Sequence, residues 1–270
     1  MTELLRCIGG VIRRDARLAA TQPLAFATRW FAPIITIAGF YFVSKLLDPH
    51  HALATGGRTT GYFSYVAVNV AFMLLQTSAI LAFAQTVRLD QIIGTLEAIV
   101  AAPRRTSLYV AACGVWPIAL SVAQVAVSLA AASAFMGLDL RATNPWSLLA
   151  FGALSTVTMA SIGILSAAAV IAFKAVPPTG YLVGGAASLL AGTLFPVTLL
   201  PPPLRAISWL LPLTHSLRGF RGAVAGESLG ALSGEAWWLL AAMLILFPLS
   251  FFVLERVVER GRRDGTLSQY

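Results

Sequence analysis

Long apolar runs separated by short polar segments form the main pattern of this chain of 270 residues. Each run approaches or exceeds the ~20 apolar residues that a helix needs to cross the hydrocarbon core of a bilayer. Because the runs are continuously apolar and do not alternate, they favour helices over the strands of a membrane barrel. The pattern predicts six membrane-spanning helices at about residues 30–47, 62–87, 108–136, 146–173, 181–200 and 237–254.

An amphipathic segment, residues 90–103 (DQIIGTLEAIVAAP), lies between the second and third runs. Its apolar residues recur at the spacing of one helical stripe: Ile92, Ile93, Leu96, Ile99 and Val100. Asp90 stands in the position of an N-cap, and Pro103 ends the helix. Both neighbouring runs are free of charged residues, so the segment is predicted to be a short helix on one membrane face, presented for docking.

The N-terminal residues 3–19 are predicted to form a second amphipathic helix, lying in the membrane interface. One face is apolar and the other basic, with Leu4, Ile8, Val11, Ile12 and Leu18 against Arg6, Arg13, Arg14 and Arg17. A helix of this kind binds an anionic membrane surface. The sequence leaves open whether it also helps to seat a cytoplasmic partner.

Residues 201–225, which begin with three consecutive prolines, are too polar for a lipid-facing span and too apolar for a free loop. They are predicted to form an outer-face re-entrant hairpin of short helices that packs against protein. The chain is thus predicted to be one all-α integral membrane domain. It comprises a cytoplasmic amphipathic segment (1–29), six spans (30–254) and a cytoplasmic tail (255–270).

Composition and charge agree with a membrane protein. Only 11% of the residues are charged and 58% are hydrophobic, whereas soluble domains carry about 25% charged residues. If both termini are cytoplasmic, 13 of the 19 Lys and Arg residues lie on that side, as the positive-inside rule requires of an even number of spans. The net charge of +8 therefore reflects topology and contact with anionic lipid rather than nucleic-acid binding.

The sequence carries no motif for catalysis, nucleotide binding or metal binding. It contains no P-loop, and its two cysteines, Cys7 and Cys113, make neither a disulfide framework nor a metal-binding spacing. The adjacent His50 and His51 are interpreted as part of a solvated loop. No catalytic residue, metal site or cofactor is therefore predicted in this chain.

The cores of the predicted spans also lack the charged residues that ion-coupled carriers and charge-ring channels use. Together with the missing P-loop and the docking helix, this indicates that an ATPase on another chain supplies the energy. Candidates for a substrate path lie on the second span, where Asn69 and Gln76 share one face with Phe72 beside it. The alternative is that these residues only form hydrogen bonds between helices.

Other polar and small residues in the spans carry weaker expectations. Thr77, Ser78 and Gln85 also occur in the second span, and Gln124 stands alone in the third, near a kink expected at Pro117. The fourth span is rich in small residues that allow close helix packing: Gly152, Ser155, Ser161, Gly163 and Ser166.

The segment 93–97, Ile-Gly-Thr-Leu-Glu, followed by Pro103, resembles the G-T-L-E…P signature of type 2 ATP-binding-cassette (ABC) exporter permeases. Residues 212–218 (PLTHSLR), with Arg221 following, are similar to a second segment of that family before the last span. The length, the spans and the amphipathic N-terminal helix also match, so the resemblance covers essentially the whole chain. The pattern is nearest to the daunorubicin-resistance, multidrug-exporter type.

The resemblance implies that residues 90–103 are a coupling helix that binds the ATPase through Ile93, Gly94, Thr95, Leu96, Glu97 and Pro103. It implies two copies of a cytoplasmic ABC ATPase, which hold ATP and Mg, and a second permease, either identical or a sister chain. It also implies export of a drug, antibiotic, lipid or glycan across a bacterial cytoplasmic membrane.

Two other functions compete with transport. One is a membrane-embedded lipid-modifying enzyme, for which only His50 and His51, or His215 with Arg218 and Arg221, could supply convergent polar groups. The other is a non-catalytic membrane assembly factor.

Overall fold

A computed structural model describes residues 2–46, 53–55, 58–95, 99, 106–173 and 182–263 of the chain. Within these residues, five helical segments are long and apolar enough to cross a membrane. They are α2 (Pro23–Leu46), α3 (Tyr62–Ile93), α5 with α6 (Thr106–Cys113 and Val115–Met136), α7 (Pro145–Phe173) and α12 (Ser233–Arg263). The prediction of an all-α integral membrane protein is confirmed.

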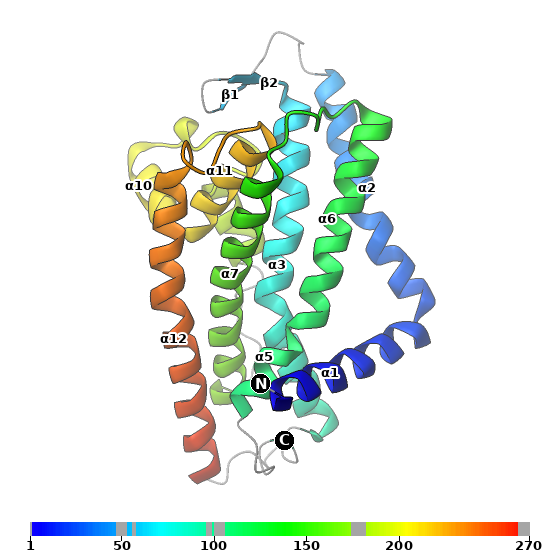
Figure 1. Ribbon diagram of the computed structural model, residues 1–270, viewed down its shortest axis with the longest axis vertical. Coiled ribbons are helices and arrows are strands. Elements are labelled where there is room, and N and C mark those ends of the chain that lie inside the picture. The colour runs from blue at the N-terminus through cyan, green and yellow to red at the C-terminus, as the bar shows by residue number, and fades with distance from the viewer. Residues whose placement is uncertain are drawn as a thin grey trace.

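The long helices run side by side, with α3 and α7 at the centre and α12 against α7 (Figure 1). The helix α1 (Thr2–Thr21) lies across one end of this bundle, which we call the α1 end. The opposite end carries α10 (Pro202–Leu210) and α11 (Pro212–Val224), and we call it the α11 end. An antiparallel pair of short strands, β1 (Leu53–Thr55) and β2 (Arg58–Thr60), lies there too, with Leu53 opposite Thr60.

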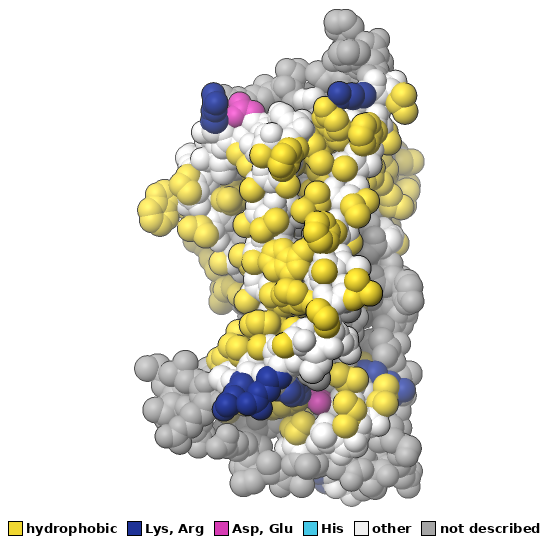
Figure 2. All heavy atoms as spheres, turned by 90° about the vertical axis from the view of Figure 1, so that its right-hand side faces the viewer, with side chains coloured by type: hydrophobic (Ala, Val, Ile, Leu, Met, Phe, Trp, Pro, Cys, Tyr) yellow, Lys and Arg dark blue, Asp and Glu magenta, His cyan; other side chains and the backbone are white. Residues whose placement is uncertain are grey.

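The surface of the bundle has the distribution of side chains that a bilayer requires. Figure 2 shows one face on which apolar side chains fill the middle and Lys and Arg side chains lie toward the two ends. Large apolar side chains such as Phe31, Ile35 and Phe42 on α2 are well exposed. Exposed apolar surface of this extent is stable in lipid and not in water.

The predicted fifth span, residues 181–200, is not one continuous helix. The described part contains a π-helical turn (Leu182–Ala187), a short α9 (Ser188–Leu190) and a 3-10 turn (Val197–Leu199). Gly192 breaks the helix because it adopts φ +79°, and a Cβ there would lie 2.8 Å from Cγ2 of Val197. Residues 174–181 lie outside the described residues, so a sixth span remains a prediction.

Close contact between backbones holds α3 against α7. A Cβ on Gly163 would lie 2.6 Å from the carbonyl oxygen of Ala79 and 2.8 Å from that of Ile80. The small residue therefore lets the two helices touch, as expected for the fourth span. Gly152 makes no such approach among the described residues, where a Cβ would meet nothing within 4 Å.

The third span is interrupted at Gly114, three residues before the expected kink at Pro117. Proline has no N–H to bond the carbonyl of residue i−4, which here is Cys113, and its ring clashes with that carbonyl. The interruption therefore appears one turn before the proline itself. Gly114 also faces the ring of Phe83, which a Cβ would approach to 2.2 Å.

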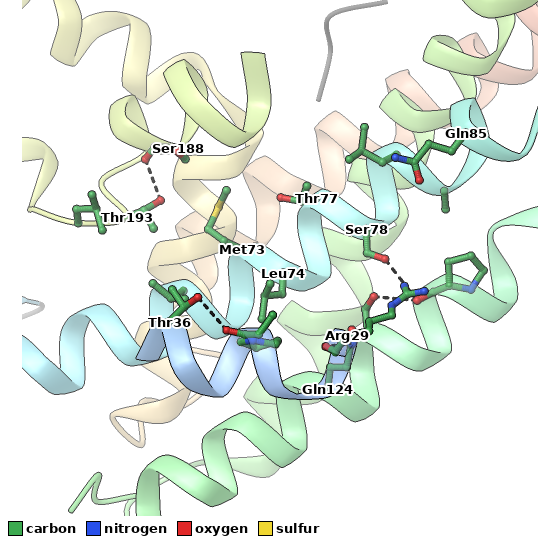
Figure 3. Close-up of a pocket in the computed structure, with 18 of the residues that line it drawn as sticks. Arg29, Thr36, Met73, Leu74, Thr77, Ser78, Gln85, Gln124, Ser188 and Thr193 are labelled. Atoms are coloured by element: carbon green, nitrogen blue, oxygen red, sulfur yellow. Dashed lines mark hydrogen bonds between the residues drawn. The ribbon is translucent and has the colours of Figure 1, made fainter. Parts of the chain in front are cut away.

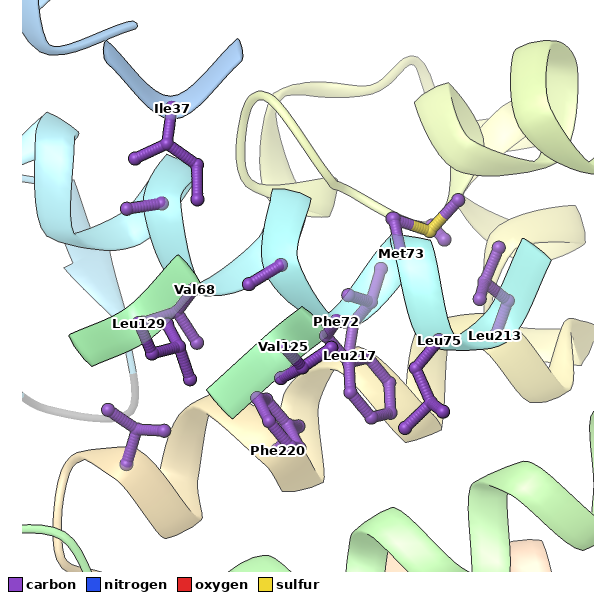
Figure 4. Close-up of a cluster of buried hydrophobic side chains, with 14 of the residues drawn as sticks. Ile37, Val68, Phe72, Met73, Leu75, Val125, Leu129, Leu213, Leu217 and Phe220 are labelled. Carbon is purple, nitrogen blue, oxygen red and sulfur yellow. The ribbon is translucent and has the colours of Figure 1, made fainter. Parts of the chain in front are cut away.

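A hydrophobic core joins α3 to α6 and α11, with Ile37 of α2 at its edge (Figure 4). The rings of Phe72 and Phe220 stack at its centre, with centroids 4.1 Å apart. Gly219 lets α11 approach α7, since a Cβ there would lie 2.1 Å from the ring of Phe151. Of the two short helices of segment 201–225, α11 thus packs against protein, whereas α10 is largely exposed apart from the buried Ser208.

Candidate functional site

The end of α3 lies at the α1 end of the bundle, inside the predicted coupling segment. The helix continues through Ile93 and stops at Gly94, which has φ +81° and donates its N–H to the carbonyl of Gln91 at 3.1 Å. A left-handed residue that ends a helix is usually glycine, because other residues pay for the contact between Cβ and backbone. The glycine of the signature therefore marks the point where the chain turns away from α3.

The prediction that Asp90 is an N-cap is wrong. Asp90 lies in the last turn of α3, and its side chain is buried. The polar residues after Val87 do not end the helix, since none of them is a proline or glycine before Gly94. The apolar stripe of the segment therefore begins on the long helix rather than on a separate short one.

The side chains at this helix end form a small apolar surface. Ile92 is 69% exposed and Ile93 63%, and Gly94 and Thr95 are exposed beside them. We call these four residues the α3-end surface. Of the predicted contact residues, Ile93, Gly94 and Thr95 belong to it, while Leu96, Glu97 and Pro103 lie outside the described residues.

A polar network lies directly behind the α3-end surface. The hydroxyl of Tyr109 on α5 donates to the carboxylate of Asp90. The guanidinium of Arg14 on α1 donates to the Tyr109 hydroxyl at 2.8 Å and to Asp90 Oδ1 at 3.4 Å. Thr95 donates its hydroxyl to the same carboxylate oxygen at 3.2 Å. These four side chains therefore join α1, α3 and α5 at one carboxylate.

Arg14 lies on one face of α1 with Arg13 and Arg17, as predicted, and its side chain also reaches the bundle. Its side chain is 36% exposed and turns to the bundle, where Nε also pairs with Asp15 at 2.9 Å. Burial alone lowers the pKa of the guanidinium, but hydrogen bonds to Asp15 and Tyr109 raise that pKa above its ordinary value. Arg14 is therefore a fixed cation that attaches α1 to the end of α3. The sequence held one signal for this network, an isolated Asp at the end of an apolar run.

A second contact fixes the last turn of α3 onto α7. The side-chain amide of Gln91 is buried and donates to the carbonyl of Val170 at 3.3 Å, and its oxygen accepts from Arg88 at 3.2 Å. Together with the Asp90 network, this bond gives the α3-end surface a rigid support on two sides.

The three candidates for a substrate path are buried near the α11 end. The amide of Asn69 donates to the carbonyl of Thr193 at 2.8 Å, and its oxygen accepts from Arg221 at 3.3 Å. Phe72 stacks on Phe220. Gln76 is fully buried, and neither atom of its amide has a partner among the described residues. The contacts of Asn69 and Phe72 favour the alternative role, which is to hold helices and turns together.

The neighbouring face of α3 lines a groove that the sequence did not indicate. The groove has a volume of about 690 Å³ and lies between α2, α3 and α6 (Figure 3). Its lining is mostly apolar, with Val70, Met73 and Leu74 from α3. Thr77, Ser78, Gln85 and Gln124, which stood out as polar residues within apolar spans, all line it.

The residues offered for a membrane-embedded enzyme are engaged in packing. His215 Nδ1 contacts the carboxylate of Glu235, and its ring stacks on Trp238 with centroids 4.2 Å apart. Arg218 pairs with the same carboxylate at 2.6 Å. Arg221 donates to the hydroxyl of Tyr65 at 3.0 Å. His50 and His51 lie outside the described residues, and within the described part no group of three or more His, Cys, Asp or Glu could hold a metal ion.

The bundle of apolar helices, with its polar groups gathered at the ends, defines a membrane protein that crosses the bilayer several times. The family model of the ABC-2 type transporter matches residues 7–224. The chain therefore belongs to the ABC-2 type transporter family, whose members are membrane subunits of ABC transporters and generally work with an ATP-binding-cassette partner. No curated protein shows a significant match to the chain.

This match confirms the resemblance read from the Gly94-Thr95 signature at the level of the family. The narrower resemblance to the daunorubicin-resistance type stays a prediction.

Proposed function

We propose that this chain is the permease subunit of an ABC exporter in a bacterial cytoplasmic membrane. It moves an amphipathic or hydrophobic substrate with energy from ATP that a separate ATPase subunit hydrolyses. The observation that carries the proposal is the exposed α3-end surface, where Ile92 and Ile93 stand free of contacts that would bury them. Within a chain that belongs to a permease family, such a surface at a membrane face fits an apolar groove on an ATPase.

In this proposal the α1 end faces the cytoplasm. Basic residues gather at that end, among them Arg13, Arg17, Arg88, Arg256, Arg260, Arg262 and Arg263. An excess of Lys and Arg on one side is the usual mark of the cytoplasmic face. The functional unit then contains two permeases, identical or paired with a sister chain, and two ATPase subunits.

The contacts behind the α3-end surface supply a route for motion. A displacement of this surface pulls on Asp90, to which Arg14 and Tyr109 are bonded. The force therefore reaches α1 and α5 as well as α3, and Gln91 passes it to α7. Movement of the ATPase would in this way change the spacing of helices across the whole bundle.

The test is co-purification with the ATPase, a P-loop protein encoded beside this chain. Replacing Ile93 by Asp puts a charge into the apolar contact, and truncating Leu96 and Glu97 to Ala removes further proposed contacts. Each change should lower the recovery of the ATPase by at least tenfold, since one buried hot-spot side chain is worth about 2 kcal/mol or more. Arg260→Asp, at an exposed site on α12, is the matched control and should leave recovery unchanged.

Substrate movement in proteoliposomes separates the exporter from the competing functions. The proposal expects movement only when the ATPase and ATP are both present. A lipid-modifying enzyme would instead change its lipid substrate without the ATPase, and an assembly factor would do neither.

A further inference from the structure

The groove between α2, α3 and α6 has a polar end and an apolar middle. Figure 3 shows Arg29, Ser78, Gln85 and Gln124 toward one end, and Thr36, Met73, Ser188 and Thr193 toward the other. Arg29 lies in the second turn of α2, so the polar end is the one nearer the α1 end of the bundle. Val70, Leu74 and Leu81 line the groove along α3.

Most polar groups in the groove are already satisfied. Ser121 donates its hydroxyl to the carbonyl of Pro117 at 2.8 Å, and Gln124 donates its amide to the carbonyl of Arg29 at 2.8 Å. Toward the other end, Thr36 and Thr193 donate to backbone carbonyls of their own segments. These groups shape the groove; the three hydroxyl donors are used within the protein, and the amide of Gln124 has one N–H engaged.

At the polar end of the groove, the side chains of Arg29 and Gln85 differ from these hydrogen-bonded groups. Among the described residues, neither the guanidinium of Arg29 nor the amide of Gln85 has a hydrogen-bond partner, and the described lining contains no Asp or Glu. Arginine near a membrane face commonly extends to the interface; the side chain of Arg29 is exposed, and it also lines the end of the apolar groove. A cation with five N–H donors and no counter-ion is suited to a phosphate or carboxylate.

We propose that this groove binds an anionic amphiphile from the cytoplasmic leaflet, with the headgroup on Arg29 and Gln85 and the acyl chain along Val70, Met73 and Leu74. The inference rests on the proposed export function and names its substrate class. Sequence reasoning alone favoured any amphipathic or hydrophobic substrate. An arginine with no acidic partner among the described residues, in a groove whose described lining has no Asp or Glu, selects anionic headgroups over cationic ones, which it repels.

The test measures equilibrium binding of radiolabelled hexadecyl phosphate to the purified permease in phosphatidylcholine nanodiscs, without the ATPase. Competitors of equal chain length are hexadecyl maltoside and hexadecyltrimethylammonium, and inorganic phosphate serves as a headgroup without a chain. Hexadecyl phosphate should bind saturably. None of the three competitors should displace it at an equal concentration.

Arg29→Gln should weaken binding of hexadecyl phosphate by about tenfold or more, the range for loss of one charge-assisted contact. Arg29→Lys keeps the charge and should retain most of the affinity. That result would show that Arg29→Gln loses affinity through loss of the charge and not through misfolding. Arg256→Gln, at an arginine on α12 that lies over the ring of Phe252, is the matched control and should bind as the unaltered protein does.

Equal competition by the maltoside, or unchanged binding to Arg29→Gln, would overturn the proposal. A second copy of the permease covering the groove would also contradict it, and would show as no probe binding together with a change of oligomeric state in Arg29→Gln. Because the binding assay omits the ATPase, its result does not depend on ATPase co-purification through the α3-end surface. Either proposal can therefore be contradicted while the other is supported.

Discussion

At the scale of single residues, Gly94 and Asp90 determine the conformation and the contacts of the end of α3. Gly94 allows the chain to leave the helix at φ +81°. The carboxylate of Asp90 accepts hydrogen bonds from Arg14, Thr95 and Tyr109. The role of Gly94 depends on backbone conformation, and the role of Asp90 depends on the charge of its carboxylate. The sequence indicated Gly94 through its signature, but it gave no sign that Arg14 or Tyr109 would reach Asp90, because both are far from it along the chain.

Substitution of Gly94 should depend on backbone conformation and not on volume. A Cβ at this position would meet no described residue within 4 Å, so the cost comes from the left-handed φ, roughly 1–2 kcal/mol for a residue with a Cβ. Gly94→Asn should therefore be better tolerated than Gly94→Val, since asparagine visits this region more readily. Recovery of the co-purified ATPase should rank glycine, asparagine, valine; an equal loss for both variants would contradict this reason.

Loss of the Asp90 network should uncouple ATP hydrolysis from transport. Asp90→Asn and Tyr109→Phe each remove a charge-assisted hydrogen bond of about 1.5–3 kcal/mol, so α1 and α5 no longer follow the end of α3. The expected result is ATPase activity within about twofold of normal and a ratio of transport to hydrolysis lowered by about tenfold. Arg13→Gln, on the exposed face of α1, is the control, and an equal loss in that variant would argue against the network.

At the scale of helices and strands, hydrophobic length determined most of what the sequence predicted correctly. The spans around α2, α3, α6, α7 and α12 were placed from apolar runs alone. The run at 181–200 is not one continuous helix because Gly192 turns the chain there, and apolarity does not record backbone conformation. The break at Gly114 likewise depends on where the ring of Pro117 contacts the preceding turn. The sequence therefore places such a break only to within one helical turn of the proline.

The contact between α3 and α7 gives a stability test at this scale. Gly163→Val would force a side chain against the backbone oxygens of Ala79 and Ile80, and overpacking of this kind costs about 1–3 kcal/mol. The midpoint of thermal unfolding in detergent should fall clearly below that of the unaltered protein. Gly152→Val, on the same helix but facing open space, should leave it nearly unchanged. Equal midpoints for the two variants would contradict the proposed packing.

At the scale of the whole molecule, the α1 end and the α11 end of the bundle have different roles. The α1 end presents the α3-end surface and the basic residues. At the α11 end, Asn69, Phe72 and Arg221 hold α3, α11 and the turn at residues 192–193 together. The groove lies between them, on a face of α3 that Asn69 and Phe72 do not share. The prediction of a substrate path at Asn69, Phe72 and Gln76 stays a prediction, because polarity alone does not tell a residue that holds helices together from one that lines a cavity.

The central claim is that the α3-end surface is where the ATPase binds, and photo-crosslinking in membranes tests it most directly. p-Benzoylphenylalanine in place of Ile93 should give a crosslinked product with the combined mass of permease and ATPase, and ATP should change its yield. The same group in place of Trp146, exposed near the start of α7, should give none. Absence of the product at position 93, with the ATPase present and active, would contradict the account.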